Sequence, residues 1–354
     1  MGRIRFAAWA VVVLAPAAAG AEPAAPPLTR EAIETATFVA APAGKAQDTS
    51  RPKKPGRKAE AAKPSPDPLL IKVQVLLDRA GFSPGAIDGR DGDNLRGALR
   101  AYAAAQGLPA RETLDQALFD RLAQGAQPVT AEITLGEAEV KGPFLASVPR
   151  RLEEQAEIGP LRYTNPREML AERYHMQRDL LSAMNPGKPL DKAGTVLLVA
   201  GVTPMGQGKI EPRPQAPKVT RIEVDKGARR VRAFGEDGAL VSDVPASIGS
   251  AEKPAPSGDT KVKGVAFDPW YTYNPRYRFA GVKARHRFSI EPGPNNPVGL
   301  VWIDLAIPSY GIHGTPEPEK IGKTESHGCI RLTNWDARSL AAHVERGTKV
   351  SFRD

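Results

Sequence analysis

Apolar residues in the first half of the chain recur with the spacing of amphipathic helices. The clearest repeat follows an i, i+3, i+4, i+7 pattern and consists of Leu95, Ala98, Leu99 and Tyr102. This spacing places the side chains on one face of a helix, and Asp93 just before it is a typical N-cap residue. Another helix is predicted before this one, and the capping box that Thr113 forms with Gln116 indicates a third helix after it. The pattern predicts a small three-helix domain over residues 67–125.

A second helical region lies at residues 161–203 and ends in a strand. The apolar positions of its two short helices are Leu170, Tyr174, Leu180 and Met184. The turn formers Asn185, Pro186 and Gly187 end the second helix, and the apolar run that follows them predicts a strand. We interpret this region as an α/β module, and residues 126–160, which show no clear period, as a connecting region.

In the last part of the chain the hydrophobic period changes to two. Apolar and polar residues alternate in KVTRIEVDK and in RRVRAFGEDGALVSDVPASIG, which is the pattern of half-buried strands. The predicted turns fall at Lys226-Gly227 and Asp237-Gly238. Short strands with Gly and Pro turns predict an all-β, sandwich-like domain over residues 218–353, with one late helix that begins at Thr333 or Asn334. The fold class is therefore multidomain α+β.

Three segments lie outside these predicted domains. Residues 1–21 combine a basic start, an apolar stretch and small residues, which is the layout of a cleaved signal peptide. The apolar stretch is shorter than the ~20 residues of a spanning helix, which disfavours an uncleaved membrane anchor. Residues 22–66, rich in Pro, Ala, Lys and Arg, predict a disordered linker, and residues 204–217 predict a second linker. We therefore expect an exported protein of the periplasm or cell envelope.

The net charge of the chain is +9 at pH 7. Such a balance is typical of proteins that bind polyanions. Because an exported protein seldom meets nucleic acid, we expect no nucleic-acid partner and favour a polyanionic envelope or wall.

The chain holds one cysteine, Cys329, within the sequence SHGCIRL. One thiol cannot form an internal disulfide. The residues that precede it do not form the apolar environment of a buried, unreactive cysteine, so a reactive role is indicated. A nearby imidazole can take the thiol proton and give a nucleophilic thiolate. His327 is close in sequence, but His313 is far enough away to arrive on an adjacent strand, which favours His313 as the base. Backbone N–H groups around Gly328 could face an oxyanion, and acyl transfer through a thioester is the natural chemistry.

Two accessory segments resemble modules that accompany cell-wall enzymes. VQVLLDRAGFSPGAIDG, with the later GALRAYAAAQGL, resembles a peptidoglycan-binding-like domain. RYTNPREMLAERYHMQRDLLSAMNPGKPLDKAGTVLLVAG resembles a degenerate LysM module, whose family binds glycans that contain N-acetylglucosamine. The resemblances imply that these modules contact glycan strands, and a spacer without ligand is the alternative.

The stretch GIHGTPEPEKIGKTESHGCIRLTNWDA resembles the signature of L,D-transpeptidases with a YkuD-type catalytic domain. The resemblance covers about residues 219–352. It implies that Cys329 is the nucleophile and that His313 accepts and returns the proton. Gly314 would orient the imidazole through its carbonyl oxygen.

The same resemblance implies roles for the residues around the cysteine. His327 and Gly328 would belong to the loop that forms the oxyanion hole. Ser326 and Arg331 would support the site or hold a substrate carboxylate, for which arginine is well suited. A structural salt bridge is the alternative role of Arg331.

The resemblance also implies the reaction. The family forms an acyl-enzyme from a tetrapeptide stem of peptidoglycan, releases D-Ala, and passes the acyl group to an amine of a second stem, usually as a 3→3 cross-link. Other members attach a lipoprotein to the wall, exchange the terminal D-amino acid, or cleave such bonds. No cofactor is implied, and the acceptor stays open.

Three alternatives compete with this interpretation. The histidines and the thiolate could bind zinc, but their spacing fits no usual zinc pattern, and we expect no metal. A catalytically silent wall-binding protein is a second alternative. The third is a peptidoglycan carboxypeptidase or endopeptidase that uses the same cysteine and hands the acyl group to water.

Overall fold

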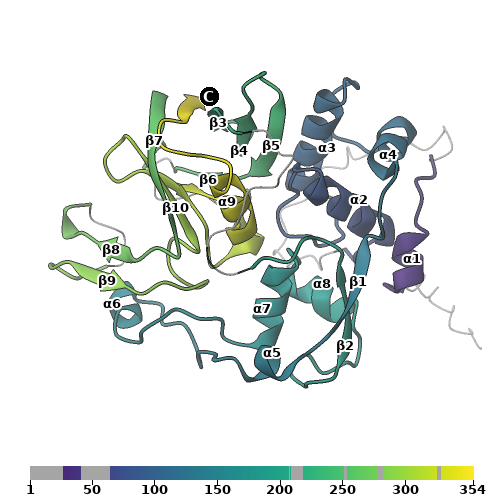
Figure 1. Ribbon diagram of the computed structural model, residues 1–354, viewed down its shortest axis with the longest axis horizontal. Helices are drawn as coiled ribbons and strands as arrows, with labels where there is room; N and C mark the ends of the chain where they lie inside the picture. The colour runs from purple at the N-terminus through teal and green to yellow at the C-terminus, as the bar shows by residue number, and fades with distance from the viewer. Residues whose placement is uncertain are drawn as a thin grey trace, which may run out of the picture.

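The computed structural model describes residues 27–40, 64–206, 208, 218–250, 253–277, 282–324 and 328–354. Figure 1 shows helices and a small two-stranded sheet in the first half of the chain and a large sheet in the second half. The predicted signal peptide, and most of the linker predicted at residues 204–217, lie outside the described residues. None of the helices described is both long enough and apolar enough to span a bilayer.

The first helices are α1 (Arg30–Glu34), α2 (Pro68–Arg79), α3 (Asp93–Ala105) and α4 (Gln116–Ala123). The start of α3 differs from the prediction by one residue, because Gly92 is its N-cap and Asp93 is its first residue. The N-cap of α4 is Asp115, not the predicted Thr113. The carboxylate of Asp115 accepts a hydrogen bond from the backbone N–H of Leu118 at 2.9 Å, which satisfies one of the unpaired N–H groups of the first turn.

The prediction of a disordered linker over residues 22–66 is wrong for residues 27–40, which form α1 and its flanks. Ile33 is fully buried against the other helices. The ammonium of Lys72 donates to the backbone carbonyl of Glu34 at 2.7 Å. One apolar anchor and a lysine that caps the helix end keep this short helix in place, although the surrounding composition is that of an unfolded chain. The remainder of the predicted linker lies mostly outside the described residues.

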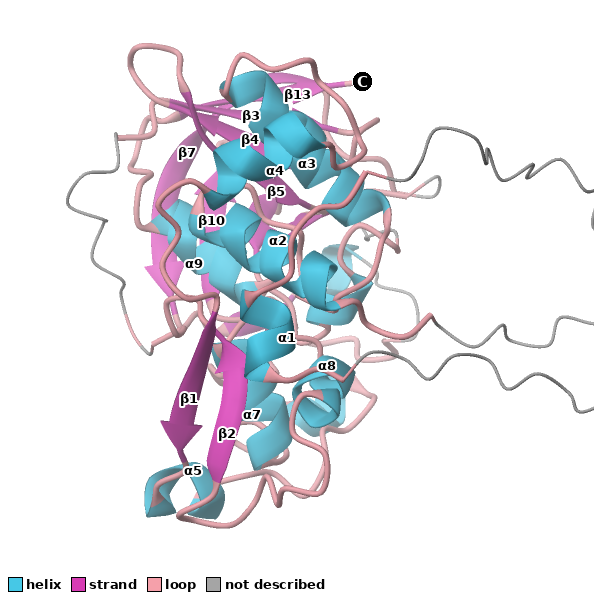
Figure 2. Cartoon of the chain, turned by 90° about the vertical axis from the view of Figure 1, so that its right-hand side faces the viewer, coloured by secondary structure: helices cyan, strands magenta, loops and turns pink. Residues whose placement is uncertain are grey.

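The elements of the second module are β1 (Thr130–Thr134), α5 (Glu137–Lys141), α6 (Leu152–Gln155), α7 (Pro166–Arg173), α8 (Arg178–Ala183) and β2 (Val196–Ala200). β1 pairs antiparallel with β2, and the two strands lie beside α7 and α8 (Figure 2). The predicted boundary at residue 161 is therefore wrong, because the first strand of this module lies inside the segment 126–160. β2 is largely buried, and its backbone groups need a paired strand.

The two predicted N-terminal modules share one hydrophobic core. A contiguous cluster of buried side chains extends from Ile33 through Leu77 and Leu99 to Leu180 and Val202. Separate domains each have their own core, so residues 67–125 and 161–203 form a single structural unit rather than two.

The C-terminal half contains a nine-stranded mixed sheet with the strand order β5-β4-β3-β13-β7-β10-β11-β12-β6. Its strands are β3 (Arg221–Asp225), β4 (Arg230–Phe234), β5 (Leu240–Pro245), β6 (Ser247–Ile248), β7 (Gly258–Phe267), β10 (Val301–Leu305), β11 (Gly311–His313), β12 (Ile330–Arg331) and β13 (Lys349–Arg353). The N-terminal part of β7 pairs with β13 and its C-terminal part pairs with β10. The long strand thus joins two groups of strands that share one core, and the all-β, sandwich-like prediction for this region fits.

One helix, α9 (Asn334–Ala341), packs against the sheet. Thr333 is its N-cap and accepts a hydrogen bond from the backbone N–H of Asp336 at 3.1 Å, as the sequence predicts. Two 3₁₀ turns and a separate hairpin complete the half: η1 (Pro275–Tyr277), η2 (Pro318–Lys320), β8 (Tyr271–Tyr273) and β9 (Phe288–Ile290). The hairpin projects from the large sheet and lies next to α6 (Figure 1).

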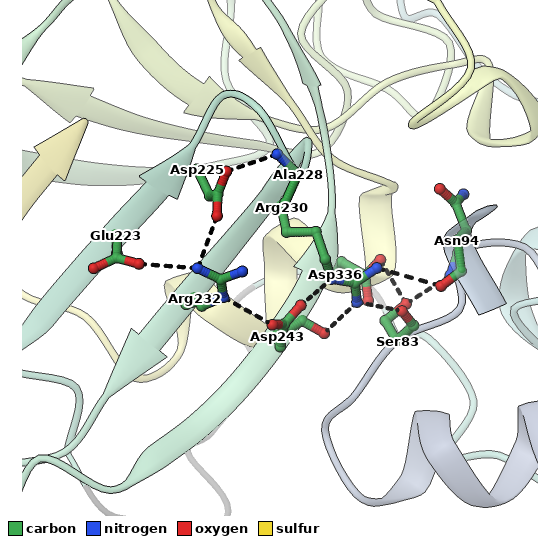
Figure 3. Close-up of polar contacts among 10 residues, drawn as sticks. Ser83, Asn94, Glu223, Asp225, Ala228, Arg230, Arg232, Asp243 and Asp336 are labelled. Carbon is green, nitrogen blue, oxygen red and sulfur yellow. Dashed lines mark hydrogen bonds and ion pairs between the residues drawn. The ribbon is translucent and has the colours of Figure 1, made fainter. Parts of the chain in front are cut away.

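A buried ion pair joins the N-terminal unit to the sheet (Figure 3). Arg230 on β4 forms a salt bridge with Asp243 on β5, and both side chains are almost completely buried. The same guanidinium donates to the backbone carbonyls of Ser83 at 3.0 Å and Asn94 at 3.3 Å. Arg232 also donates to Asp243, at 3.2 Å. This network fixes the helical unit against the outer strands of the sheet.

Candidate active site

The pairing of two short strands brings His313 and Cys329 into one cleft. β11 and β12 are adjacent and parallel, with Ile312 opposite Ile330 and His313 opposite Arg331. His313 is the last residue of β11, and Cys329 directly precedes β12. Both side chains line a cleft of about 770 Å³. The parallel arrangement converts a separation of sixteen residues in sequence into a shared site.

The imidazole of His313 is held in one tautomer. Its side chain is buried, and Nδ1 lies 2.7 Å from the carbonyl oxygen of Gly314. A carbonyl only accepts hydrogen bonds, so Nδ1 carries the proton and Nε2 keeps the lone pair. The ring of Trp302 stacks on the imidazole, with 5.5 Å between the centroids. Burial and the nearby charge of Arg331 lower the pKa of His313 to about 3, so the resting imidazole is neutral.

Cys329 is a protonated thiol at neutral pH. Burial raises its pKa above the ordinary value, and this effect outweighs the backbone hydrogen bond from Gly311 and the charges of Arg331 and Lys253, which lower it. The thiol donates weakly to the carbonyl oxygen of Ser309 at 3.7 Å. The resting pair is therefore a thiol and a neutral imidazole, which suits transfer of the thiol proton to Nε2 only when an electrophile arrives.

The alkylation rate of Cys329 is expected to report this raised pKa. Because only the thiolate reacts, the rate with iodoacetamide should keep rising through pH 9, without a plateau at neutral pH. The chain has no other cysteine to interfere, and N-acetylcysteine serves as the exposed reference. A rate that levels off below pH 7 would instead indicate a preformed thiolate–imidazolium pair.

The predicted residues around the cysteine are placed only in part. Gly328 is buried and has a φ of 107°, a backbone conformation that glycine adopts without strain. Arg331 lines the cleft beside the thiol. Ser326 and His327 lie outside the described residues. The structure thus brings together His313, Gly314, Gly328, Cys329 and Arg331.

The sequence did not indicate which residue packs against Gly314. Asn334 was predicted only as a helix start, yet its Oδ1 accepts a hydrogen bond from the backbone N–H of Leu300 at 3.0 Å. A Cβ at Gly314 would lie 2.0 Å from that Oδ1, so only glycine fits there. The Nδ2 of Asn334 donates to Glu172 of α7 at 2.6 Å. The N-terminal unit therefore supports the segment that orients His313.

Aromatic residues of the cleft were also missed. Tyr271 on β8 lines the cleft, and burial with the proximity of Cys329 raises its pKa to about 12. Trp270 beside it is 58% exposed. The only sequence signal for them was the aromatic run DPWYTYNP, which has no periodic pattern that points to a site.

No cluster of three His, Cys, Asp or Glu side chains that could hold a metal ion occurs among the described residues. The zinc alternative includes His327, which lies outside the described residues.

Comparisons with known proteins match part of this chain to L,D-transpeptidases. The family model of YkuD, an L,D-transpeptidase catalytic domain, matches residues 219–351. YkuD of Bacillus licheniformis, named as an L,D-transpeptidase, is 32% identical over 187 residues, which cover 52% of this chain and 92% of that protein. YbiS of Escherichia coli, also named as an L,D-transpeptidase, is 31% identical over 201 residues, or 54% of this chain and 61% of that protein.

Solved structures are more distant. The crystal structure of L,D-transpeptidase 3 from Mycobacterium tuberculosis is 18% identical and has a TM-score of 0.32. The match covers 45% of this chain and 68% of that chain.

Proposed function

We propose that this chain, which belongs to the YkuD family of L,D-transpeptidases, uses Cys329 to transfer acyl groups of peptidoglycan stem peptides. The observation that carries the proposal is the shared cleft of Cys329 and His313, with the imidazole fixed by Gly314 so that Nε2 is free to accept a proton. Thiol, base and orienting carbonyl have the roles that nucleophilic acyl transfer requires.

The first half of the reaction forms a thioester. The sulfur of Cys329 attacks the carbonyl carbon of the donor stem while Nε2 of His313 takes the thiol proton. The C–N bond to the terminal D-Ala then breaks, and the leaving amine takes that proton from the imidazolium. D-Ala departs and the neutral imidazole is restored.

The second half of the reaction releases the product and restores the free enzyme. An acceptor amine attacks the thioester, Nε2 of His313 removes a proton from this amine, and the C–S bond breaks as Cys329 is reprotonated. We propose that the backbone N–H groups of the loop around Gly328 stabilise the oxyanion in both halves. Arg331 beside the thiol holds the terminal carboxylate of the donor.

The acceptor and the compartment are parts of the proposal. Residues 1–21 have the layout of a signal peptide, which supports export to the periplasm or envelope. The basic charge suits a wall polymer, and a second stem would give a 3→3 cross-link. The N-terminal unit would then contact the glycan strands.

Mass spectrometry of the products tests the function. The mature chain and a Cys329→Ala variant are incubated with disaccharide-tetrapeptide from peptidoglycan. We expect loss of D-Ala and appearance of a cross-linked dimer with the unchanged chain only. Tripeptide without dimer would show that water is the acceptor, which favours the carboxypeptidase alternative. Unchanged tetrapeptide would contradict the proposal.

A further inference from the structure

The segment between α5 and α7 extends from the N-terminal unit to the C-terminal half of the chain. Its residues 142–162 are called the strap here. It belongs in sequence to the N-terminal unit, yet its helix α6 contacts β9 of the hairpin beside the cleft. Figure 1 shows α6 next to β8 and β9, away from the other helices of its unit.

The middle of the strap is attached to the hairpin. A carboxylate oxygen of Glu153 accepts hydrogen bonds from the backbone N–H groups of Lys283 at 3.0 Å and Ala284 at 3.2 Å. These two residues belong to the loop that joins β8 to β9. The backbone N–H of Glu153 itself and, with smaller effects, those of Lys283 and Ala284 lower the pKa of Glu153, so this carboxylate is charged at neutral pH and accepts hydrogen bonds across the two segments.

The end of the strap is attached to the segment after β9. The backbone N–H of Leu161 donates to the carbonyl of Pro292 at 3.2 Å, and its carbonyl accepts from the N–H of Asn295 at 2.9 Å. The buried side chain of Asn295 donates to the carbonyl of Arg162 at 2.9 Å. With both attachments, the backbone of the strap is fixed against the catalytic half.

The strap supplies part of the lining of the catalytic cleft. Arg150, Arg151 and Leu152 line the same cleft as His313 and Cys329. Among the described lining residues are four arginines and no aspartate or glutamate. The four are Arg150, Arg151, Arg287 and Arg331. A cleft with this lining attracts anionic groups.

We propose that Arg150 and Arg151 of the strap bind a carboxylate on an internal residue of the stem peptide. This inference rests on the proposed function and assigns a specificity-determining surface to it. Arg331, two residues after the nucleophile, is placed for the terminal carboxylate, so arginines on another segment serve a carboxylate farther from the broken bond. Arginine matches the geometry of a carboxylate with two parallel N–H groups.

The two arginines are available for such a ligand. Arg150 is exposed and forms no ion pair with a described residue. Arg151 is 56% exposed and lies 3.8 Å from Glu153 and 3.5 Å from Glu154. The pair with Glu154 is exposed on both sides and is therefore worth little, so a carboxylate ligand can replace it. The fixed backbone of the strap reduces the ordering cost of binding.

Binding measurements test the inference without turnover. The full chain with Cys329→Ala is titrated by calorimetry with two tetrapeptides, one with a free carboxylate on an internal residue and one with the carboxamide there. Three further variants carry Cys329→Ala together with other substitutions. The test variant has Arg150→Ala and Arg151→Ala, and a second variant has Arg150→Lys and Arg151→Lys. The control has Arg346→Ala, which replaces an exposed arginine of the catalytic half.

For the free-carboxylate peptide we expect Kd to rise about tenfold in the double alanine variant. The double lysine variant should recover part of the affinity. The carboxamide peptide should bind the double alanine variant and its parent equally, and Arg346→Ala should change neither peptide. An equal loss for both peptides, no loss, or the same loss in Arg346→Ala would overturn the inference.

The product analysis separates this result from the proposed function. If the strap inference alone fails, the unchanged chain still makes product and the peptides bind without discrimination. If the proposed function fails, the unchanged chain makes no product, whatever the binding measurements show.

Discussion

Replacing His313 with alanine is expected to lower the rate of stem-peptide turnover by about 10³-fold. A positioned general base contributes roughly 10²- to 10⁴-fold, and we propose His313 as the base for the thiol of Cys329. Burial raises the pKa of Cys329 and lowers that of His313 to about 3. Without the imidazole, no other neutral base among the described residues that line the cleft can take the thiol proton.

His313→Asn is the matched control for the position of the ring. The amide of asparagine can still donate to the carbonyl of Gly314, as Nδ1 does now, but it cannot accept a proton. Both variants should therefore lose turnover in single-turnover assays, while their thermal unfolding shows that they are folded. Substantial activity in His313→Asn would mean that the histidine has a structural role only.

Replacing Arg230 with methionine is expected to lower the free energy of unfolding by about 3–5 kcal/mol. The variant leaves the carboxylate of Asp243, which is 0% exposed, without its closest partner. Arg232 still donates to that carboxylate at 3.2 Å, so we expect a loss of stability near the lower end of this range. The two hydrogen bonds to Ser83 and Asn94 are also lost, so the N-terminal unit loosens from the sheet.

Urea unfolding measures this effect. The double variant Arg230→Met with Asp243→Leu removes both charges and should recover most of the loss, because an apolar pair of similar size avoids an unpaired buried charge. Lys320→Met is the surface control, since its ion pair with Glu317 is exposed and is worth at most about 1 kcal/mol. A double variant no more stable than Arg230→Met would contradict the buried-charge explanation.

Several features follow from the order of residues along the chain. Period-two alternation with Gly turns predicts β3, β4 and β5, because these strands pair with their neighbours in sequence. Thr333 predicts the start of α9 because capping is local. The lone Cys329 and the His-Gly-Thr segment indicate a nucleophile and a base by chemical type alone, and both lie within residues 219–351, which the family model matches.

Other features depend on contacts between residues far apart in sequence. β1 was not predicted because its partner β2 lies more than sixty residues later, and α1 was not predicted because one buried residue, Ile33, keeps it in place. The strap has no periodic pattern, since its residues are fixed by polar contacts with the hairpin rather than by an apolar face.

The sequence by itself determined which residue types were available for chemistry: one thiol, a histidine followed by glycine, and small residues around the nucleophile. Only the tertiary structure decided their protonation and their neighbours. Parallel pairing of β11 with β12 brings His313 and Cys329 together, and burial makes both groups neutral at rest. Desolvation and long-range strand pairing depend on the whole fold, so no local stretch of sequence contains them.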